Sequence, residues 1–153
     1  MCAKRSTVFR IEPRHVRLRM RASDKESAIH ELLGMLAEAG DIPDRAAAEK
    51  VIFDREASMS TGMEDGIAIP HGKTDTVHSL QAVVGVHPQG IDFDAADGSP
   101  SHIFVLTLSP ASKSGPHIRF LAQISRLLHS PQTREKILAA ESEQEVVRLL
   151  GMG

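Results

Sequence analysis

His71 is the residue whose surroundings most clearly suggest chemistry. It lies between Pro70 and Gly72, directly after the apolar residues 67–69. The apolar run predicts a strand, and we expect Pro70 and Gly72 to turn the chain so that the imidazole sits at an accessible loop tip. A neutral imidazole is a nucleophile, and its usual pKa of about 6.5 leaves much of it neutral at pH 7. His71 is therefore a candidate for reversible phosphorylation, although the short motif also fits an ordinary turn histidine.

Two further side chains could stabilise a phosphoryl group. His117 directly follows Pro116 in the first turn of a predicted helix, where free N–H groups and the helix dipole favour an anion. Arg55 ends another predicted helix, and a guanidinium can bind two phosphate oxygens at once. The alternatives are a partly exposed histidine at a helix start, and an arginine that complements the helix dipole or pairs with Glu56 or Asp54.

Smaller candidates lie in the loop between Arg55 and His71 and directly after His71. Ser60 and Thr61 could donate hydroxyl hydrogen bonds to the same phosphate, although in a loop such residues are commonly turn formers. Gly72 has no side chain, so we expect it to leave the face of the imidazole open.

Other reaction classes have no motif behind them. The eight histidines are scattered and there is one cysteine, so a zinc site is not expected. The sequence also lacks a G-x-S-x-G elbow and a Walker loop. We therefore expect no metal and no cofactor.

The composition is typical of a globular protein. The 153 residues are 41% hydrophobic and 25% charged, with a net charge of −2, which argues against a nucleic-acid partner. Tyr and Trp are absent, so stacking on bases has few candidates. No apolar run approaches the roughly 18 residues of a membrane span, and the first residues lack a signal peptide. We expect a cytoplasmic protein without membrane insertion.

Hydrophobic periodicity predicts the elements that position these side chains. The predicted strands lie within residues 8–20, 67–69, 80–86, 91–93 and 103–108, and five helices begin near residues 23, 44, 116, 130 and 142. We expect the first helix to open with a capping box from Ser23 to Glu26. We expect the strand over residues 80–86 to end at Pro88 to Gly90. In the helix after Pro116, the predicted inner face includes Ile118 and Leu128.

The order of these elements predicts the fold class. Strands and helices mix without strict βαβ alternation, so we expect an α/β (α+β) fold. A mixed sheet of about five strands, with helices packed on it, would form a single domain over residues 1–153, with residues 1–6 disordered.

The stretch from Arg55 to Lys73, REASMSTGMEDGIAIPHGK, carries a family resemblance. It resembles the signature of the mannitol/fructose-type IIA domains of the phosphoenolpyruvate-dependent sugar phosphotransferase system. The similarity is greatest to the free-standing nitrogen-regulatory branch. It continues through residues 91–98 and 103–108 to His117, and spans residues 6–150.

The resemblance implies a mixed α/β fold with one phosphorylated histidine, His71, flanked by His117 and Arg55. It also implies that a small histidine phosphocarrier protein donates the phosphoryl group. One departure bears on how that donor docks. Residues 112–116, SKSGP, are more basic and richer in Gly and Pro than the acidic stretch expected of the family.

Two interpretations of the phosphorylated state follow from the resemblance. A regulatory protein would use phosphorylation of His71 to gate contact with a transporter, kinase or other target. A sugar relay would pass the phosphoryl group to a fructose- or mannitol-type transporter domain. Relay versions are often fused to their partner domains and this chain carries none, so we expect the regulatory role. A metal-dependent or hydrolytic enzyme using His71, His102 and His117 is a third interpretation without a supporting motif.

Overall fold

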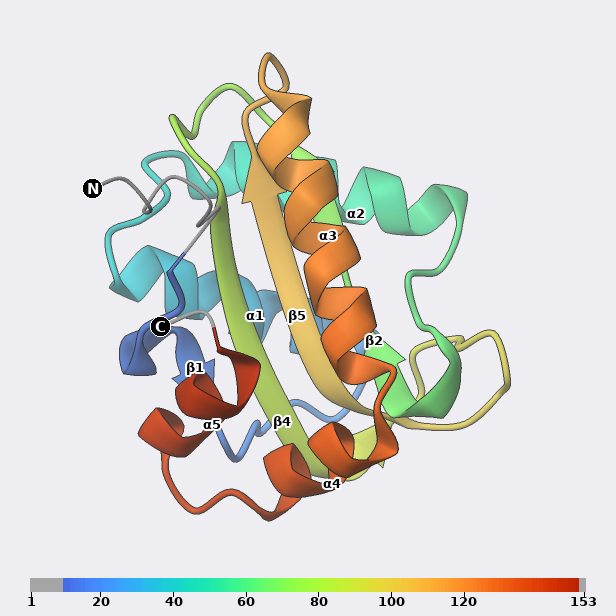
Figure 1. The fold of residues 1–153 in the computed structure, drawn as a ribbon. Coiled ribbons are helices and arrows are strands. Elements are labelled where there is room, and N and C mark those ends of the chain that lie inside the picture. Colours follow the sequence, from blue (N-terminus) through green and yellow to red (C-terminus); the bar gives the residue numbers. More distant parts are fainter. Residues whose placement is uncertain (1–9, 152–153) are drawn as a thin grey trace, which may run out of the picture.

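A mixed five-stranded sheet covered by helices on both faces forms the core of the protein (Figure 1). The computed structural model describes residues 10–151. The strand order is β1-β4-β5-β2, and β3 also pairs with β5. The central pair β4 and β5 is antiparallel, whereas β1, β2 and β3 pair in parallel with their neighbours. The predicted mixed α/β fold with one sheet is confirmed.

The strands are β1 (Val16–Arg17), β2 (Ile67–Ala68), β3 (His71–Lys73), β4 (Gln81–Ile91) and β5 (Ser101–Ser109). The helices are α1 (Lys25–Glu38), α2 (Arg45–Ser58), α3 (Ser114–Leu128), α4 (Pro131–Ala139) and α5 (Glu143–Leu150). Within residues 10–20 the strand is shorter than predicted, because Pro13 opens a 3-10 turn. Residues 1–6, expected to be disordered, lie outside the described residues. None of the helices within residues 10–151 is long and apolar enough to span a membrane.

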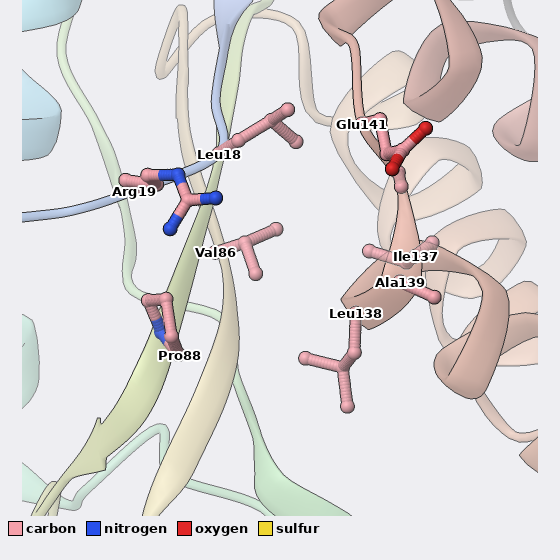
Figure 2. Close-up of a pocket in the computed structure, with 9 residues that line it drawn as sticks. Leu18, Arg19, Val86, Pro88, Ile137, Leu138, Ala139 and Glu141 are labelled. Atoms are coloured by element: carbon pink, nitrogen blue, oxygen red, sulfur yellow. The ribbon is translucent and has the colours of Figure 1, made fainter.

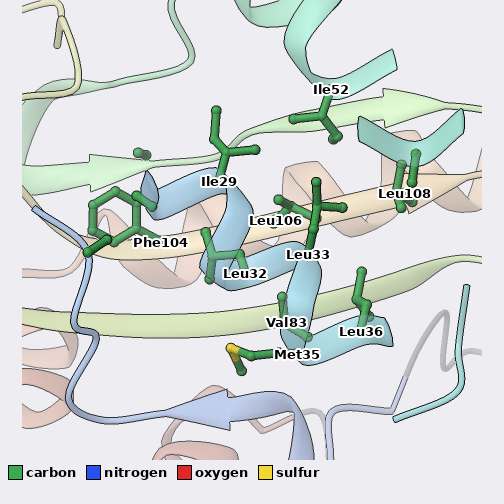
Figure 3. Packing of buried hydrophobic residues seen from close by; sticks show 14 of the residues in the cluster. Ile29, Leu32, Leu33, Met35, Leu36, Ile52, Val83, Phe104, Leu106 and Leu108 are labelled. Atoms are coloured by element: carbon green, nitrogen blue, oxygen red, sulfur yellow. The ribbon is translucent and has the colours of Figure 1, made fainter. Parts of the chain in front are cut away.

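Two apolar clusters lie on opposite faces of the sheet. Strand β5 contributes Phe104, Leu106 and Leu108 to the cluster shared with α1 and α2, part of which Figure 3 shows. It contributes Ile103 and Val105 to the cluster shared with α3, α4 and α5. Because helices cover both faces, this strand is apolar almost without interruption, as its sequence predicts.

Helix α1 is capped one residue later than predicted. Asp24 is the N-cap, and its carboxylate accepts the backbone N–H of Ser27 at 2.8 Å. In return, Ser27 Oγ accepts the N–H of Asp24 at 3.1 Å. The predicted pairing of Ser23 with Glu26 is therefore wrong. Ser23 with Glu26 and Asp24 with Ser27 have the same spacing, so the local sequence did not show which pair forms the capping box.

Strand β4 continues through Pro88 instead of ending before it. The pairing with β5 shifts register between Val86 and Ile91. Gly90 lies in this interval with φ of 87°, and its N–H donates to His87 Nδ1 at 3.0 Å. A bulge of this kind accommodates a proline that cannot donate to the ladder, which is why the predicted strand end is wrong.

The inner face of α3 differs from the predicted one. The helix buries His117, Phe120, Ile124 and Leu128, whereas Ile118 is 61% exposed. Hydrophobic patterning placed Ile118 inside because it counts histidine as polar. His117 occupies a core position, and this shifts the buried face by one residue.

Candidate functional site

His71 lies in strand β3 and not at the predicted loop tip. The strand pairs in parallel with the end of β5, which sets His71 opposite Thr107 and Gly72 opposite Leu108. The carbonyl of Pro70 accepts the N–H of Thr107 at 3.0 Å. Backbone pairing thus holds this segment at the sheet edge, where a preceding proline is tolerated. The predicted turn is wrong, and His71 is half-buried on a fixed strand.

One hydrogen bond decides which nitrogen of His71 carries the proton. Nδ1 lies 2.9 Å from the carbonyl oxygen of Ile69. A carbonyl oxygen only accepts, so Nδ1 is the protonated nitrogen of the neutral ring. The lone pair is then on Nε2, which points away from this backbone contact. The sequence left the tautomer of His71 open, and the backbone two residues earlier determines it.

Gly72 lets β3 pack directly on α2. A Cβ at this position would lie 2.9 Å from Val51 Cγ2, 3.2 Å from the Val51 carbonyl carbon and 3.3 Å from the Ile52 nitrogen. Two of these atoms belong to backbone and cannot rotate away. The absence of a side chain therefore brings β3, with His71, against the helix that carries Arg55. The expectation that Gly72 leaves the face of the His71 imidazole open to a substrate stays a prediction.

His117 is buried, with 3% of its surface exposed. The sequence placed it at the helix start, but α3 begins earlier, at Ser114, so His117 lies one turn inside the helix. Its Nδ1 is 2.9 Å from Ser109 Oγ. The centre of its ring is 5.4 Å from that of His71, with 52° between the ring planes. The structure thus brings together two histidines that are 46 positions apart in the chain.

Burial lowers the pKa of His117 to about 4, and the neighbouring His71 and Lys73 add to this effect. A charged imidazole loses its hydration when it is buried. His117 is therefore neutral at pH 7, and it can contribute a hydrogen bond but not a positive charge.

A hollow of about 500 Å³ joins the predicted site residues. His71, His117 and Arg55 line it together with Lys73 and Leu121. Lys73 closes the sequence run that begins at Arg55, yet sequence reasoning did not single it out. Its position two residues after His71 was the available signal. Two cationic groups and two imidazoles around an open space form a site suited to an anion.

Arg55 is anchored at the C-terminal end of α2. Its Nη1 donates to the carbonyl oxygen of Met59 at 2.7 Å. Its two acidic neighbours are engaged elsewhere, since Asp54 pairs with Lys50 at 2.8 Å and Glu56 is buried. Among the described residues Arg55 forms no ion pair with either, so its other N–H groups can serve a ligand.

Ser60 and Thr61 are held by other partners. Ser60 Oγ donates to the carbonyl oxygen of Phe93 at 2.7 Å. Glu56 accepts the Thr61 hydroxyl at 2.6 Å and its backbone N–H at 2.8 Å, and it pairs with Lys25 Nζ at 2.9 Å. These contacts anchor the loop after α2. The structure does not place either hydroxyl in the lining of the hollow beside His71.

A second groove lies elsewhere, between the segment that follows β1 and helix α4 (Figure 2). Its volume is about 440 Å³, and Leu18 and Val86 face Ile137 and Leu138 across it. No histidine lines it. Within residues 10–151, no cluster of three His, Cys, Asp or Glu side chains is arranged to hold a metal.

Comparison with known proteins identifies the family. Residues 10–152 match the family described as "Phosphoenolpyruvate-dependent sugar phosphotransferase system, EIIA 2". The chain belongs to this family. The resemblance seen in the sequence is confirmed, and the chain is accordingly a phosphotransferase component. Its EIIA 2 domain contains the whole of the hollow with His71 and His117.

Relatives in the EIIA 2 family carry sugar-specific and regulatory names. The fructose-specific EIIA component of Haloferax volcanii is 40% identical over 126 residues, covering 82% of each chain. The fructose-specific EIIABC component of Bacillus subtilis is 33% identical over 135 residues, and the match spans 88% of this chain but 21% of that protein. The crystal structure of nitrogen regulatory protein IIA-Ntr from Neisseria meningitidis matches with a TM-score of 0.85 at 27% identity, covering 91% of this chain and 94% of that one.

Proposed function

We propose that this EIIA 2 protein is a phosphoryl carrier in which Nε2 of His71 forms the bond to phosphorus. The observation that carries the proposal is the hydrogen bond from His71 Nδ1 to the carbonyl of Ile69. It leaves the lone pair of Nε2 as the nucleophile of the neutral ring. Because His71 is half-buried and lines an open hollow, the phosphoryl group of a partner can reach it.

The transfer step needs no proton movement at His71. The Nε2 lone pair attacks the phosphorus of the donor's phosphohistidine, and the donor's N–P bond breaks. Its electron pair returns to the donor nitrogen while Nδ1–H of His71 stays bonded to Ile69. Phosphoryl transfer mainly demands positioning and charge stabilisation, so the step uses no cofactor.

The charges around the hollow fit the group that would be carried. A phosphoryl group brings up to about two negative charges at pH 7. Arg55 and Lys73 supply two cations, and the guanidinium of Arg55 can bind two oxygens at once. His117, which also lines the hollow, adds a neutral donor.

The donor in this proposal is a histidine phosphocarrier protein of the cytoplasm, and two outputs are candidates. The 40% identity with the fructose-specific EIIA component favours relay to a sugar transporter domain. A nitrogen regulatory protein shares the fold with a TM-score of 0.85, so a regulator whose target senses the phosphorylation state is the second candidate. The match covers 82% of the fructose-specific relative, so a sugar-specific component need not be fused to its partner domains. The expectation of a regulatory role, which relied on the lack of such a fusion, is weakened.

Phosphoryl uptake tests the proposal. The protein is incubated with phosphoenolpyruvate, the general phosphotransferase enzyme and its histidine phosphocarrier, and its intact mass is measured. We expect one acid-labile phosphoryl group on His71, no uptake by His71→Gln, and normal uptake by His78→Gln, which alters an exposed histidine seven residues away. Uptake by His71→Gln would show that the acceptor is misassigned.

A chase separates the two outputs. The phosphorylated protein is purified and mixed with a fructose-type IIB domain. Rapid loss of the phosphoryl mass to that domain supports the sugar relay. Retention of the phosphoryl group, when the same IIB domain is charged by its own EIIA component, supports the regulator.

A further inference from the structure

The buried hydroxyl of Ser109 is the contact that orients His117. Ser109 ends strand β5, is fully buried, and places Oγ 2.9 Å from His117 Nδ1. Its own carbonyl accepts the N–H of Thr74 at 2.9 Å, and it lies opposite Lys73 in the pairing with β3. The hydroxyl is thus fixed relative to the strand that carries His71.

Counting donors and acceptors decides the direction of this hydrogen bond. A serine hydroxyl has one proton to donate, and a neutral imidazole has one donor nitrogen and one acceptor nitrogen. Within residues 10–151, Nδ1 of His117 is the single partner of Ser109 Oγ. If Nδ1 carried the ring proton, the hydroxyl proton of Ser109 would be buried without an acceptor, which is unfavourable. The hydroxyl therefore donates to Nδ1.

We propose that Ser109 is a positioning residue that holds His117 in the tautomer protonated at Nε2, so that His117 donates a hydrogen bond to the phosphoryl group carried by His71. The inference rests on the proposed function. The Nε2 side of the ring is the side that Ser109 does not occupy, and His117 lines the hollow that it shares with His71.

The two histidines would then have opposite tautomers for a physical reason. His71 meets a backbone carbonyl, which only accepts, so its Nδ1 keeps the proton and its Nε2 is nucleophilic. His117 meets a hydroxyl that needs an acceptor, so its Nε2 keeps the proton. The ring of His71 then attacks phosphorus with its lone pair, and the ring of His117 stabilises the phosphoryl oxygens with its N–H.

Nitrogen NMR of the histidine rings tests the tautomer directly. In ¹⁵N-labelled protein at pH 7, we expect the His117 Nδ1 signal in the unprotonated range and the Nε2 signal in the protonated range. Ser109→Ala should move both signals toward a tautomer average, and Ser109→Thr, which keeps a hydroxyl, should restore the original pattern. Protonated Nδ1 in the wild type, or signals unchanged in Ser109→Ala, would overturn the proposal.

Ser101→Ala is the matched control. Ser101 is on the same strand and equally buried, but its hydroxyl has no partner within the described residues. Ser109→Ala should slow phosphoryl uptake by about fivefold, a typical effect of one neutral hydrogen bond, and Ser101→Ala should leave the rate unchanged. Equal slowing in both variants would mean a general packing effect and would refute the positioning role.

The uptake assay separates this inference from the proposed function. If wild-type protein takes up no phosphoryl group while the NMR pattern follows Ser109 as expected, the proposed function fails and the tautomer assignment stands. If uptake is normal and Ser109→Ala matches the wild type in rate and ring signals, the carrier function stands and Ser109 has no positioning role.

Discussion

Acid should destabilise this protein through His117 more than through an ordinary histidine. Burial lowers the pKa of His117 to about 4 in the folded chain, whereas an exposed histidine in the unfolded chain has a pKa of about 6.5. Above pH 6.5 the residue is neutral in both states. Between pH 6.5 and 4 the unfolded chain binds a proton that the folded chain does not, so stability falls as the pH falls.

The expected size follows from the two pKa values. At pH 4, linkage predicts that His117 lowers the free energy of unfolding by about 3 kcal/mol relative to pH 7. Below pH 4 the folded protein is protonated too, and the contribution stops growing. Because whole domains are stabilised by only about 5–15 kcal/mol, a loss of this size is easily measured.

The measurement compares wild type with His117→Gln, which cannot titrate. Urea unfolding is followed at pH 7, 6, 5 and 4 by far-UV circular dichroism, since the chain has no Trp or Tyr for fluorescence. Carboxylates titrate in both proteins, so their effect cancels in the difference between the two curves. The wild type should lose about 3 kcal/mol more than the variant between pH 7 and pH 4. Parallel curves would refute the reasoning, because His117 would then titrate alike in folded and unfolded protein.

Three further substitutions test other parts of the site and its support. Arg55→Ala should lower the equilibrium yield of phosphorylated protein by about tenfold, because it removes a charged planar donor. Arg55→Lys should lower the yield by less, because it keeps the positive charge as a point charge. The yield is measured by intact mass at increasing donor concentration, and equal effects of the two variants would contradict this. Gly72→Ala should destabilise the protein by about 1–3 kcal/mol, because the added Cβ overpacks against α2. Gly34→Ala should stabilise the protein by about 0.5–1 kcal/mol, because its Cβ would meet nothing closer than 3.8 Å and alanine favours the helix. Thermal melts in which both variants shift the melting temperature in the same direction would contradict this. Glu56→Ala should lower the free energy of unfolding in urea by about 3–5 kcal/mol, because it removes the ion pair with Lys25 and leaves the buried donors of Thr61 without an acceptor. A loss below about 1 kcal/mol would disprove that role.

The sequence by itself determined the fold class and singled out the candidate site residues that the structure brings together. The apolar run in β5 and the amphipathic helices required a covered sheet, because both patterns bury their apolar side chains only when helices pack on both faces. The motif around His71, and the positions of Arg55 and His117, were recognisable because they are carried by local sequence.

Local patterns failed where two solutions had the same spacing or where a polar residue took a core position. The N-cap of α1 is Asp24 and not the predicted Ser23, since each of the two has a side-chain oxygen and a polar residue three positions later. His117 displaced Ile118 from the inner face of α3, because hydropathy does not foresee a buried neutral imidazole.

Only the tertiary structure decided the chemical state of the two histidines. The proton position on His71 depends on how the folded backbone places the carbonyl of Ile69, and that of His117 depends on the hydroxyl of Ser109 in strand β5. The low pKa of His117 depends on the burial that α3 gains by packing on β5. Tautomer and pKa are set by the groups within a few ångströms of a ring, and most of those groups are distant in the chain until it folds.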